Sequence, residues 1–70
     1  MPYRTNLDLP PPVRHVLPAH AQDIYRAAFN HAWERYGDDL AGREERCHRI
    51  AWAAVKRAYH KTEDGWLLNR

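Results

Sequence analysis

Two stretches of this sequence place apolar residues at steps that alternate between three and one, and this spacing constrains the fold more than any other feature. Between Pro18 and Tyr36 the apolar positions are Ala21, Ile24, Tyr25, Ala28, Phe29, Ala32, Trp33 and Tyr36. After Gly42 they are Cys47, Ile50, Ala51, Ala54, Val55, Ala58 and Tyr59. Such steps keep side chains on one face of an α-helix. The pattern therefore predicts two amphipathic helices that pack on each other.

The residue sizes in the two stripes indicate how these helices would pack. Small side chains let two helix axes approach closely, and large ones fill the space between them. The small residues are the alanines at positions 28, 32, 51, 54 and 58, and the large ones are Ile24, Phe29, Trp33, Ile50 and Val55. Gly37 is expected to end the first helix, because glycine takes the left-handed conformation at low cost.

Prolines and turn residues organise the two ends of the chain. Residues 1–11 hold too many prolines for a helix and are expected to be extended, whereas Pro12 is suited to begin a short helix. Beyond His60, the turn sequence KTEDG precedes a short apolar run at residues 66–68. We expect this run to pair with residues 3–5. The predicted fold is mainly α, with a short N-terminal helix, two longer packed amphipathic helices and a minor two-stranded antiparallel sheet formed by the N- and C-terminal segments.

A chain of 70 residues buries only about 60% of the surface that its unfolded form exposes. We expect residues 1–70 to form one complete domain whose core depends on its three tryptophans, four tyrosines and one phenylalanine. A lone cysteine excludes an internal disulfide, and no stretch resembles a signal peptide or reaches the roughly 18 apolar residues needed to cross a bilayer. The sequence favours a cytoplasmic monomer without membrane insertion.

The sequence offers little that could support catalysis or metal binding. It contains no serine, and its one thiol, Cys47, falls on a predicted core stripe. His48 points about 100° away from Cys47 on a helix, so these two side chains would not chelate one ion together. His20 is expected to bond the backbone near the Pro18 break. We therefore predict no enzyme activity, no cofactor and no metal site.

The outer face of the last helix is the best candidate for binding a partner. It carries a mostly basic strip of Arg46, Arg49, Lys56, Arg57 and His60, next to the partly exposed Trp52. An aromatic side chain beside cations can stack on a nucleic-acid base or anchor a protein interface. A solvated helix face is the alternative, because acids at a helix start and bases at its end suit the helix dipole. Alternatively, Trp52 is expected to cover Trp66 from the tail. The formal net charge of +2 does not decide between these alternatives.

Three sequence blocks resemble the ChaB family: MPYRTNLDLP, VRHVLPAHAQDIYRAAFNHAW and RIAWAAVKRAY. They span almost the whole chain, and the strongest stretch runs from Leu17 to Trp33. The resemblance implies a small helical domain with a minor two-stranded sheet. It also implies regulation of a cation/proton antiporter, the role by which family members are described. ChaB-like domains also resemble modules found beside nucleic-acid-binding segments of longer proteins.

The functional prediction is a small non-enzymatic cytoplasmic regulator that binds a protein partner, with a membrane cation antiporter as the candidate. The alternative is a nucleic-acid-binding accessory module that uses the basic face of the last helix. A structural protein with its own homodimer interface is a third possibility. Binding that weakens steeply with salt would distinguish the nucleic-acid module, since phosphate contacts release counterions.

Overall fold

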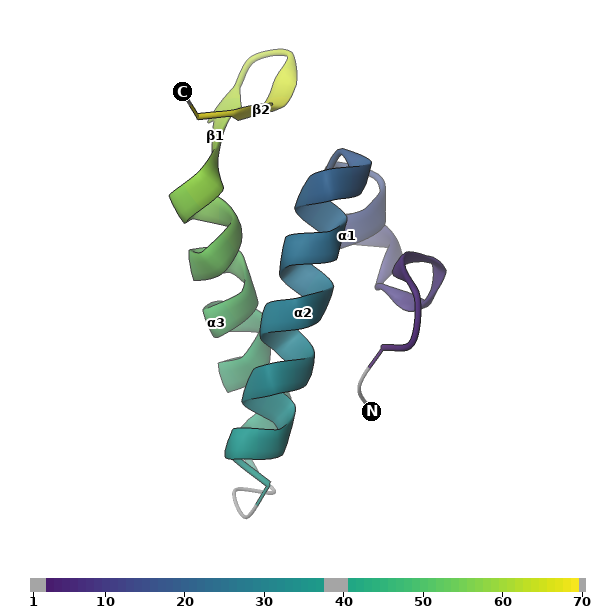
Figure 1. Ribbon diagram of the computed structural model, residues 1–70, viewed down its shortest axis with the longest axis vertical. Helices are drawn as coiled ribbons and strands as arrows, with labels where there is room; N and C mark the ends of the chain where they lie inside the picture. The colour runs from purple at the N-terminus through teal and green to yellow at the C-terminus, as the bar shows by residue number, and fades with distance from the viewer. Residues whose placement is uncertain (1–2, 38–40, 70) are drawn as a thin grey trace.

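The two predicted amphipathic helices form an antiparallel pair in the computed structural model, which describes residues 3–37 and 41–69 (Figure 1). The first, α2, spans Ala19–Arg35, and the second, α3, spans Arg43–Ala58. Their bounds lie within two residues of the limits expected from the two apolar stripes. The prediction of a mainly α fold built on two packed helices is confirmed.

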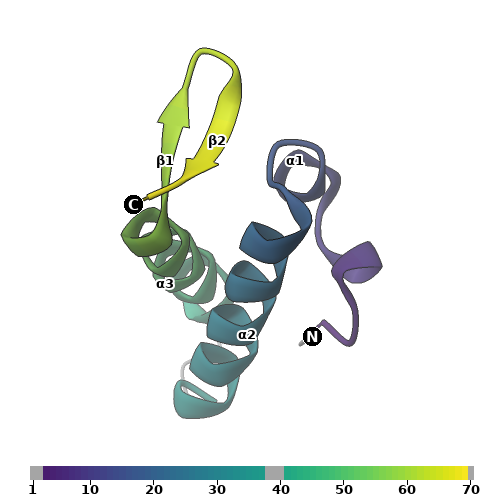
Figure 2. The ribbon, with the colours of Figure 1, turned by 45° about the horizontal axis from the view of Figure 1, so that its top comes forward.

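Short elements flank the helix pair on both sides. Before α2 come the 3-10 turn η1 (Asn6–Asp8) and the short helix α1 (Pro11–Arg14). After α3 the chain forms the strands β1 (Tyr59–Thr62) and β2 (Gly65–Leu68). The two strands form a hairpin that projects from the end of α3 (Figure 2).

The small sheet is antiparallel, as predicted, but its expected pairing of the N- and C-terminal segments is wrong. Its strands are β1 and β2, with Tyr59 opposite Leu68 and Thr62 opposite Gly65. Glu63 and Asp64 alone make the turn, and Gly65 supplies the positive φ of 122° that closes it. The turn sequence therefore joins two adjacent strands. Its first strand begins at Tyr59, which the stripe had assigned to the helix.

Residues 3–5 do not pair with a strand, and Tyr3 instead bonds the side chain of Asn30 on α2. The backbone amide of Tyr3 donates to Asn30 Oδ1 at 2.8 Å, and Asn30 Nδ2 donates to the Tyr3 carbonyl at 2.7 Å. A second hydrogen bond attaches the N-terminal segment to α2, because Arg26 Nε donates to Asn6 Oδ1 at 2.8 Å. These side chains hold the N-terminal segment alongside α2 (Figure 1). The segment was expected to be fully extended, but it also makes the η1 turn.

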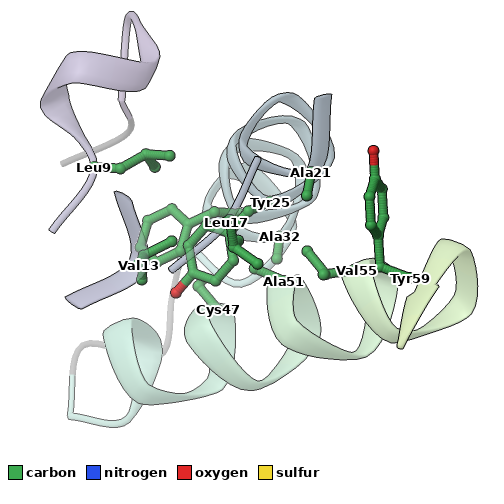
Figure 3. Packing of buried hydrophobic residues seen from close by; sticks show 11 residues of the cluster. Leu9, Val13, Leu17, Ala21, Tyr25, Ala32, Cys47, Ala51, Val55 and Tyr59 are labelled. Atoms are coloured by element: carbon green, nitrogen blue, oxygen red, sulfur yellow. The ribbon is translucent and has the colours of Figure 1, made fainter. Parts of the chain in front are cut away.

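The core lies where the N-terminal segment, α2 and α3 meet (Figure 3). Tyr25 and Phe29 are its largest fully buried side chains, and α3 contributes Ala51 and Val55. Its buried residues are Leu9, Val13, Leu17, Ala21, Tyr25, Phe29, Ala32, Cys47, Ala51, Val55 and Tyr59. The core positions predicted for Phe29 and Val55 are confirmed. Ile24, Trp33 and Ile50 are only partly buried at its edge.

The end of α2 is held by an arginine from the next helix. Gly37 does not adopt a positive φ, contrary to expectation, so it does not end the helix by a left-handed turn. Arg43 instead donates through Nε to the carbonyl of Trp33 at 3.0 Å. The Arg43 guanidinium carbon also lies 3.8 Å from the centroid of the Trp33 ring. Since the last carbonyls of a helix lack partners within it, this contact fixes the junction between α2 and α3.

Candidate functional site

Two arginines of the predicted basic strip lie near the start of α3. Arg46 places its guanidinium carbon 5.0 Å from the ring centroid of Tyr36, which directly follows α2. Arg49 makes an ion pair of 3.2 Å with Glu45 one turn earlier, and both side chains are exposed. An exposed pair of this kind adds little stability. Arg49 therefore fits the alternative that the basic strip is a solvated helix face, whereas Arg46 also packs on an aromatic ring.

The other members of the strip face three different surroundings. Lys56 borders a surface formed by two tryptophans, whereas Arg57 lines a groove between α2 and α3. These residues are adjacent in sequence, so their side chains point about 100° apart on the helix. His60 lies on β1, not on the last helix as expected, and its Nδ1 is 2.7 Å from Asn69 Oδ1. The structure thus distributes the six predicted site residues over separate surfaces.

Trp52 and Trp66 form an aromatic pair with ring centroids 5.6 Å apart. This contact confirms the expectation that Trp52 meets Trp66 from the tail. Lys56 and Lys61 border the pair, and together the four residues line an open depression of about 540 Å³. A neighbouring depression extends from Trp52 and Trp66 to His15, Glu63 and Asp64. Sequence reasoning missed Lys61 as a neighbour of the tryptophans, because it assigned Lys61 to the turn sequence KTEDG, whereas Lys61 lies on β1 opposite Trp66.

An apolar groove of about 590 Å³ runs between α2 and α3. Its lining residues are Ile24, Ala27, Ala28, His31, Ile50, Ala53, Ala54 and Arg57. Sequence reasoning had placed Ile24 and Ile50 between the helices as core-filling residues. The overlooked signal is the pair of adjacent alanines on each helix, since only one member of each pair belongs to the packing stripe. The second alanine widens the apolar face toward solvent.

A chain of polar contacts crosses from the core to the surface. The Tyr25 hydroxyl bonds Nδ1 of His48, and His48 Nε2 lies 3.7 Å from a carboxylate oxygen of Glu44. Tyr25 is completely buried, and burial raises the pKa of its hydroxyl well above the ordinary value of 10.0. The hydroxyl therefore remains protonated at neutral pH. This pairing satisfies a buried polar group, and no residue spacing in the sequence could have revealed it.

The remaining chemically capable side chains have structural partners. Cys47 is fully buried, and burial raises the pKa of its thiol despite the nearby Arg43 and Arg46. Its predicted place in the core is confirmed. His20 Nδ1 lies 3.1 Å from the Tyr59 hydroxyl, so the expected backbone bond of His20 is wrong. Across residues 3–37 and 41–69, no group of three His, Cys, Asp or Glu side chains is placed to hold a metal ion.

The fold and these surfaces define a small helix-pair domain that presents an apolar groove on one side and a tryptophan pair on the other. The sequence model of one family, described as ChaB, matches residues 9–67. This chain belongs to the ChaB family. The resemblance carried by the three sequence blocks is thereby confirmed.

Curated relatives and a solved structure also show that this chain is similar to ChaB proteins. Proteins named "Putative cation transport regulator ChaB" from Escherichia coli (strain K12) and Shigella flexneri are each 58% identical to this chain over 69 residues. Each alignment covers 91% of this chain and 91% of the relative. The structure titled "NMR solution structure of the putative cation transport regulator ChaB" matches with a TM-score of 0.86 and 52% identity. That match covers 99% of this chain and 100% of the other.

Neither long helix in the described part of the chain is long and apolar enough to span a membrane.

Proposed function

We propose that this chain is a non-enzymatic cytoplasmic regulator that acts by binding a protein, and that its partner is a membrane cation/proton antiporter. The observation that carries the proposal is the apolar groove between α2 and α3, lined by six alanine and isoleucine side chains and flanked by Arg57 and His31. An apolar surface rimmed by charge is typical of a protein interface. The names of the relatives, as regulators of cation transport, support the choice of partner.

The side chains that could carry chemistry support a binding role. The one thiol is buried with a raised pKa, so little of it is present as the reactive thiolate. The Tyr25 hydroxyl is buried and bonded to His48, and the His20 ring is bonded to Tyr59. Each of these groups stabilises the fold through its contacts.

A deletion strain and an affinity capture test this proposal together. Loss of the protein should change tolerance to sodium, potassium or calcium salts, and crosslinked capture from membranes should recover an antiporter. When this protein is produced again in the deletion strain, salt tolerance should recover in proportion to the amount of protein, because a regulator without catalytic activity acts by binding its partner. Unchanged ion tolerance together with no recovered transporter would contradict the proposal.

Light scattering of the purified chain should give the mass of a monomer, and a stable dimer would instead favour the homodimer interface.

The tryptophan surface supports a second candidate function, binding of single-stranded nucleic acid. Trp52 and Trp66 offer aromatic area for base stacking, and Lys56 and Lys61 supply two ammonium groups for phosphates. The carboxylates of Glu63 and Asp64 in the adjoining depression oppose this role.

A fluorescence titration with labelled oligothymidylate tests the nucleic-acid candidate. Binding should weaken steeply with salt and should be lost when Lys56 and Lys61 are both replaced by alanine. Arg57→Ala is the control, because Arg57 lies in the groove instead of beside the tryptophans. No binding at low salt, or equal loss in the control, would exclude this surface.

A further inference from the structure

The groove between α2 and α3 is apolar along its floor and basic at its rim. The floor consists of Ile24, Ala27, Ala28, Ile50, Ala53 and Ala54, whereas the ionisable residues among those that line it are Arg57 and His31. Among the residues that the structure describes, no acidic side chain belongs to this lining. The groove therefore favours an occupant with an apolar face and negative charge at its edges.

Positively charged side chains continue one row on each helix beyond the groove lining, and the exposed carboxylate of Glu34 lies beside the row on α2. On α3, Arg46, Ile50, Ala53 and Arg57 follow steps of four, three and four, which keep them in one row. On α2 the corresponding row is Ile24, Ala28, His31 and Arg35. Arg35 and Arg46 both lie over the ring of Tyr36, with guanidinium carbons 5.9 and 5.0 Å from its centroid. Because the helices are antiparallel, these two arginines flank one end of the groove and Arg57 flanks the other.

The groove opens on the side of the helix pair that the N-terminal segment leaves uncovered. Arg26 and Asn30 hold that segment, and the groove residues on α2 are Ile24, Ala27, Ala28 and His31. At about 100° per residue, Arg26 and Asn30 lie roughly 150° and 110° around α2 from the mean direction of these four residues, so the segment and the groove are on different faces. The groove is thus bounded by α2 and α3 alone, and a third helix could lie along both.

The alanines and the charges together select the kind of occupant. Four alanines in the floor permit close approach of another backbone, and Arg46 and Arg57 are eleven residues, or roughly 16 Å, apart along α3. An amphipathic helix of about three turns would span this length. A second copy of this chain would bring the same arginines face to face, so like charges oppose self-association through the groove.

We propose that the groove binds an amphipathic helix of the partner protein whose apolar face carries leucine-sized residues and whose flanks carry Asp or Glu. This inference rests on the proposed function and specifies the segment by which an antiporter would be recognised. The apolar face of the bound helix lies between α2 and α3. Its acidic flanks pair with Arg57 at one end of the groove and with Arg35 and Arg46 at the other end.

A designed peptide probes the groove directly. The probe is a fluorescein-labelled 16-residue helix with leucines on one face, glutamates on its flanks and glutamines elsewhere. The matched control peptide has lysine at every glutamate position. The full chain should bind the acidic peptide about tenfold more tightly than the basic one, and added salt should reduce this difference. Equal affinity for both peptides, or no binding of either, would overturn the inference.

A pair of charge reversals locates the binding surface on the chain. Arg57→Glu should weaken the acidic peptide about tenfold, whereas Lys56→Glu should change its affinity less than about twofold. Both residues are exposed and adjacent in sequence, and both substitutions change the charge by the same amount, but only Arg57 lines the groove. Amide chemical shifts should move at Ala27 and Ala53 and remain in place at Lys61. Equal effects of both reversals would exclude the groove.

Photo-crosslinking separates this inference from the proposed function. A photoreactive residue at position 53 should attach to an acidic amphipathic segment of the antiporter, and the same residue at position 61 should not. An antiporter that crosslinks only from position 61, or whose capture is unaffected by Arg57→Glu, would overturn the groove inference and leave the proposed function intact. Specific binding of the acidic peptide without any antiporter would contradict the proposed function and support the groove.

Discussion

The hydroxyl of Tyr25 shows how one side chain in this small core combines apolar packing with a hydrogen bond. Its ring lies at 5.3 Å from Trp52 and 6.4 Å from Phe29, measured between centroids, and its hydroxyl bonds His48. A buried tyrosine hydroxyl without a partner is costly, whereas the partly exposed imidazole of His48 can form hydrogen bonds with water instead. The two partners of this bond should therefore respond differently to mutation.

We expect His48→Leu to lower the free energy of unfolding by about 1–3 kcal/mol, because it leaves the Tyr25 hydroxyl buried and unpaired. In a Tyr25→Phe background the same substitution should cost less than half as much. Urea denaturation of the four proteins in this cycle measures both values. An equal cost in the two backgrounds would show that the loss of His48 ring packing, and not the hydrogen bond, is responsible.

The raised pKa of Tyr25 predicts a loss of stability in alkali. The folded-state pKa lies above the ordinary value of 10.0, so below that pH the hydroxyl is protonated in both the folded and unfolded states. Above about pH 10 the unfolded chain releases the proton first, so the free energy of unfolding falls as pH rises. Denaturation midpoints measured from pH 8 to 11 should show this decline. The decline should be shallower in Tyr25→Phe, and an unchanged slope would contradict the assignment.

At the scale of elements, a few hydrogen bonds determine how the two ends of the chain attach to the helix pair. The N-terminal segment is held by the two bonds between Asn30 and the backbone of Tyr3. At the other end, the Asn69 amide donates to the Ala58 carbonyl at 2.7 Å, so the hairpin returns to the end of α3. Both attachments satisfy backbone groups that a third strand or a longer helix would otherwise pair.

Replacing Asn30 by alanine should release the N-terminal segment from α2. The loss of two hydrogen bonds should cost about 1–3 kcal/mol and should change the chemical shifts of Tyr3 and Asn6. His31→Ala is the matched control, because His31 is the next residue and faces the groove. Nuclear magnetic resonance spectra and urea melts would measure both effects. Similar changes in the two variants would show that the two Asn30 hydrogen bonds contribute no measurable stability.

Gly65→Ala should destabilise the hairpin through its backbone alone. The φ of 122° is strained for an L-residue, while an added Cβ would meet no atom within 4 Å. We expect a loss of about 1–3 kcal/mol, with faster amide hydrogen exchange in β1 and β2. Glu63→Ala, in the same turn but at negative φ, should change stability by less than about 0.5 kcal/mol. A harmless Gly65→Ala would contradict this account of the turn.

For the molecule as a whole, the periodicity predicted both long helices and much of the core. Phe29, Ala51 and Val55 lie where the stripes place them. Periodicity could not predict that Leu9 and Val13 cover the core from outside both stripes, because that depends on long-range contacts made by Asn30 and Arg26. The sequence predicts the basic strip as one surface of the last helix, but only Arg57 lines the groove and only Lys56 borders the tryptophan pair. The other members lie elsewhere, and His60 lies on β1.

The difference between core and groove gives a prediction for cooperative unfolding. Phe29→Ala should cost about 3–5 kcal/mol, because Phe29 is buried and contacts Tyr3, Tyr25 and Trp33. Ile50→Ala should cost clearly less, because Ile50 is only partly buried and lines the groove. Urea denaturation measures both. Equal costs would indicate that the groove is closed in solution and that Ile50 belongs to the core.

A helix pair covered on one side has a consequence for the speed of recognition. An occupant can settle between α2 and α3 without displacing Leu9, Val13 or Leu17, which seal the core from the other side. Encounters that need no prior opening typically proceed at about 10⁵–10⁷ M⁻¹s⁻¹, and the basic rim accelerates those with acidic partners. Partners would then differ mainly in residence time. The lifetime of each complex, more than the frequency of encounters, would determine which one is effective.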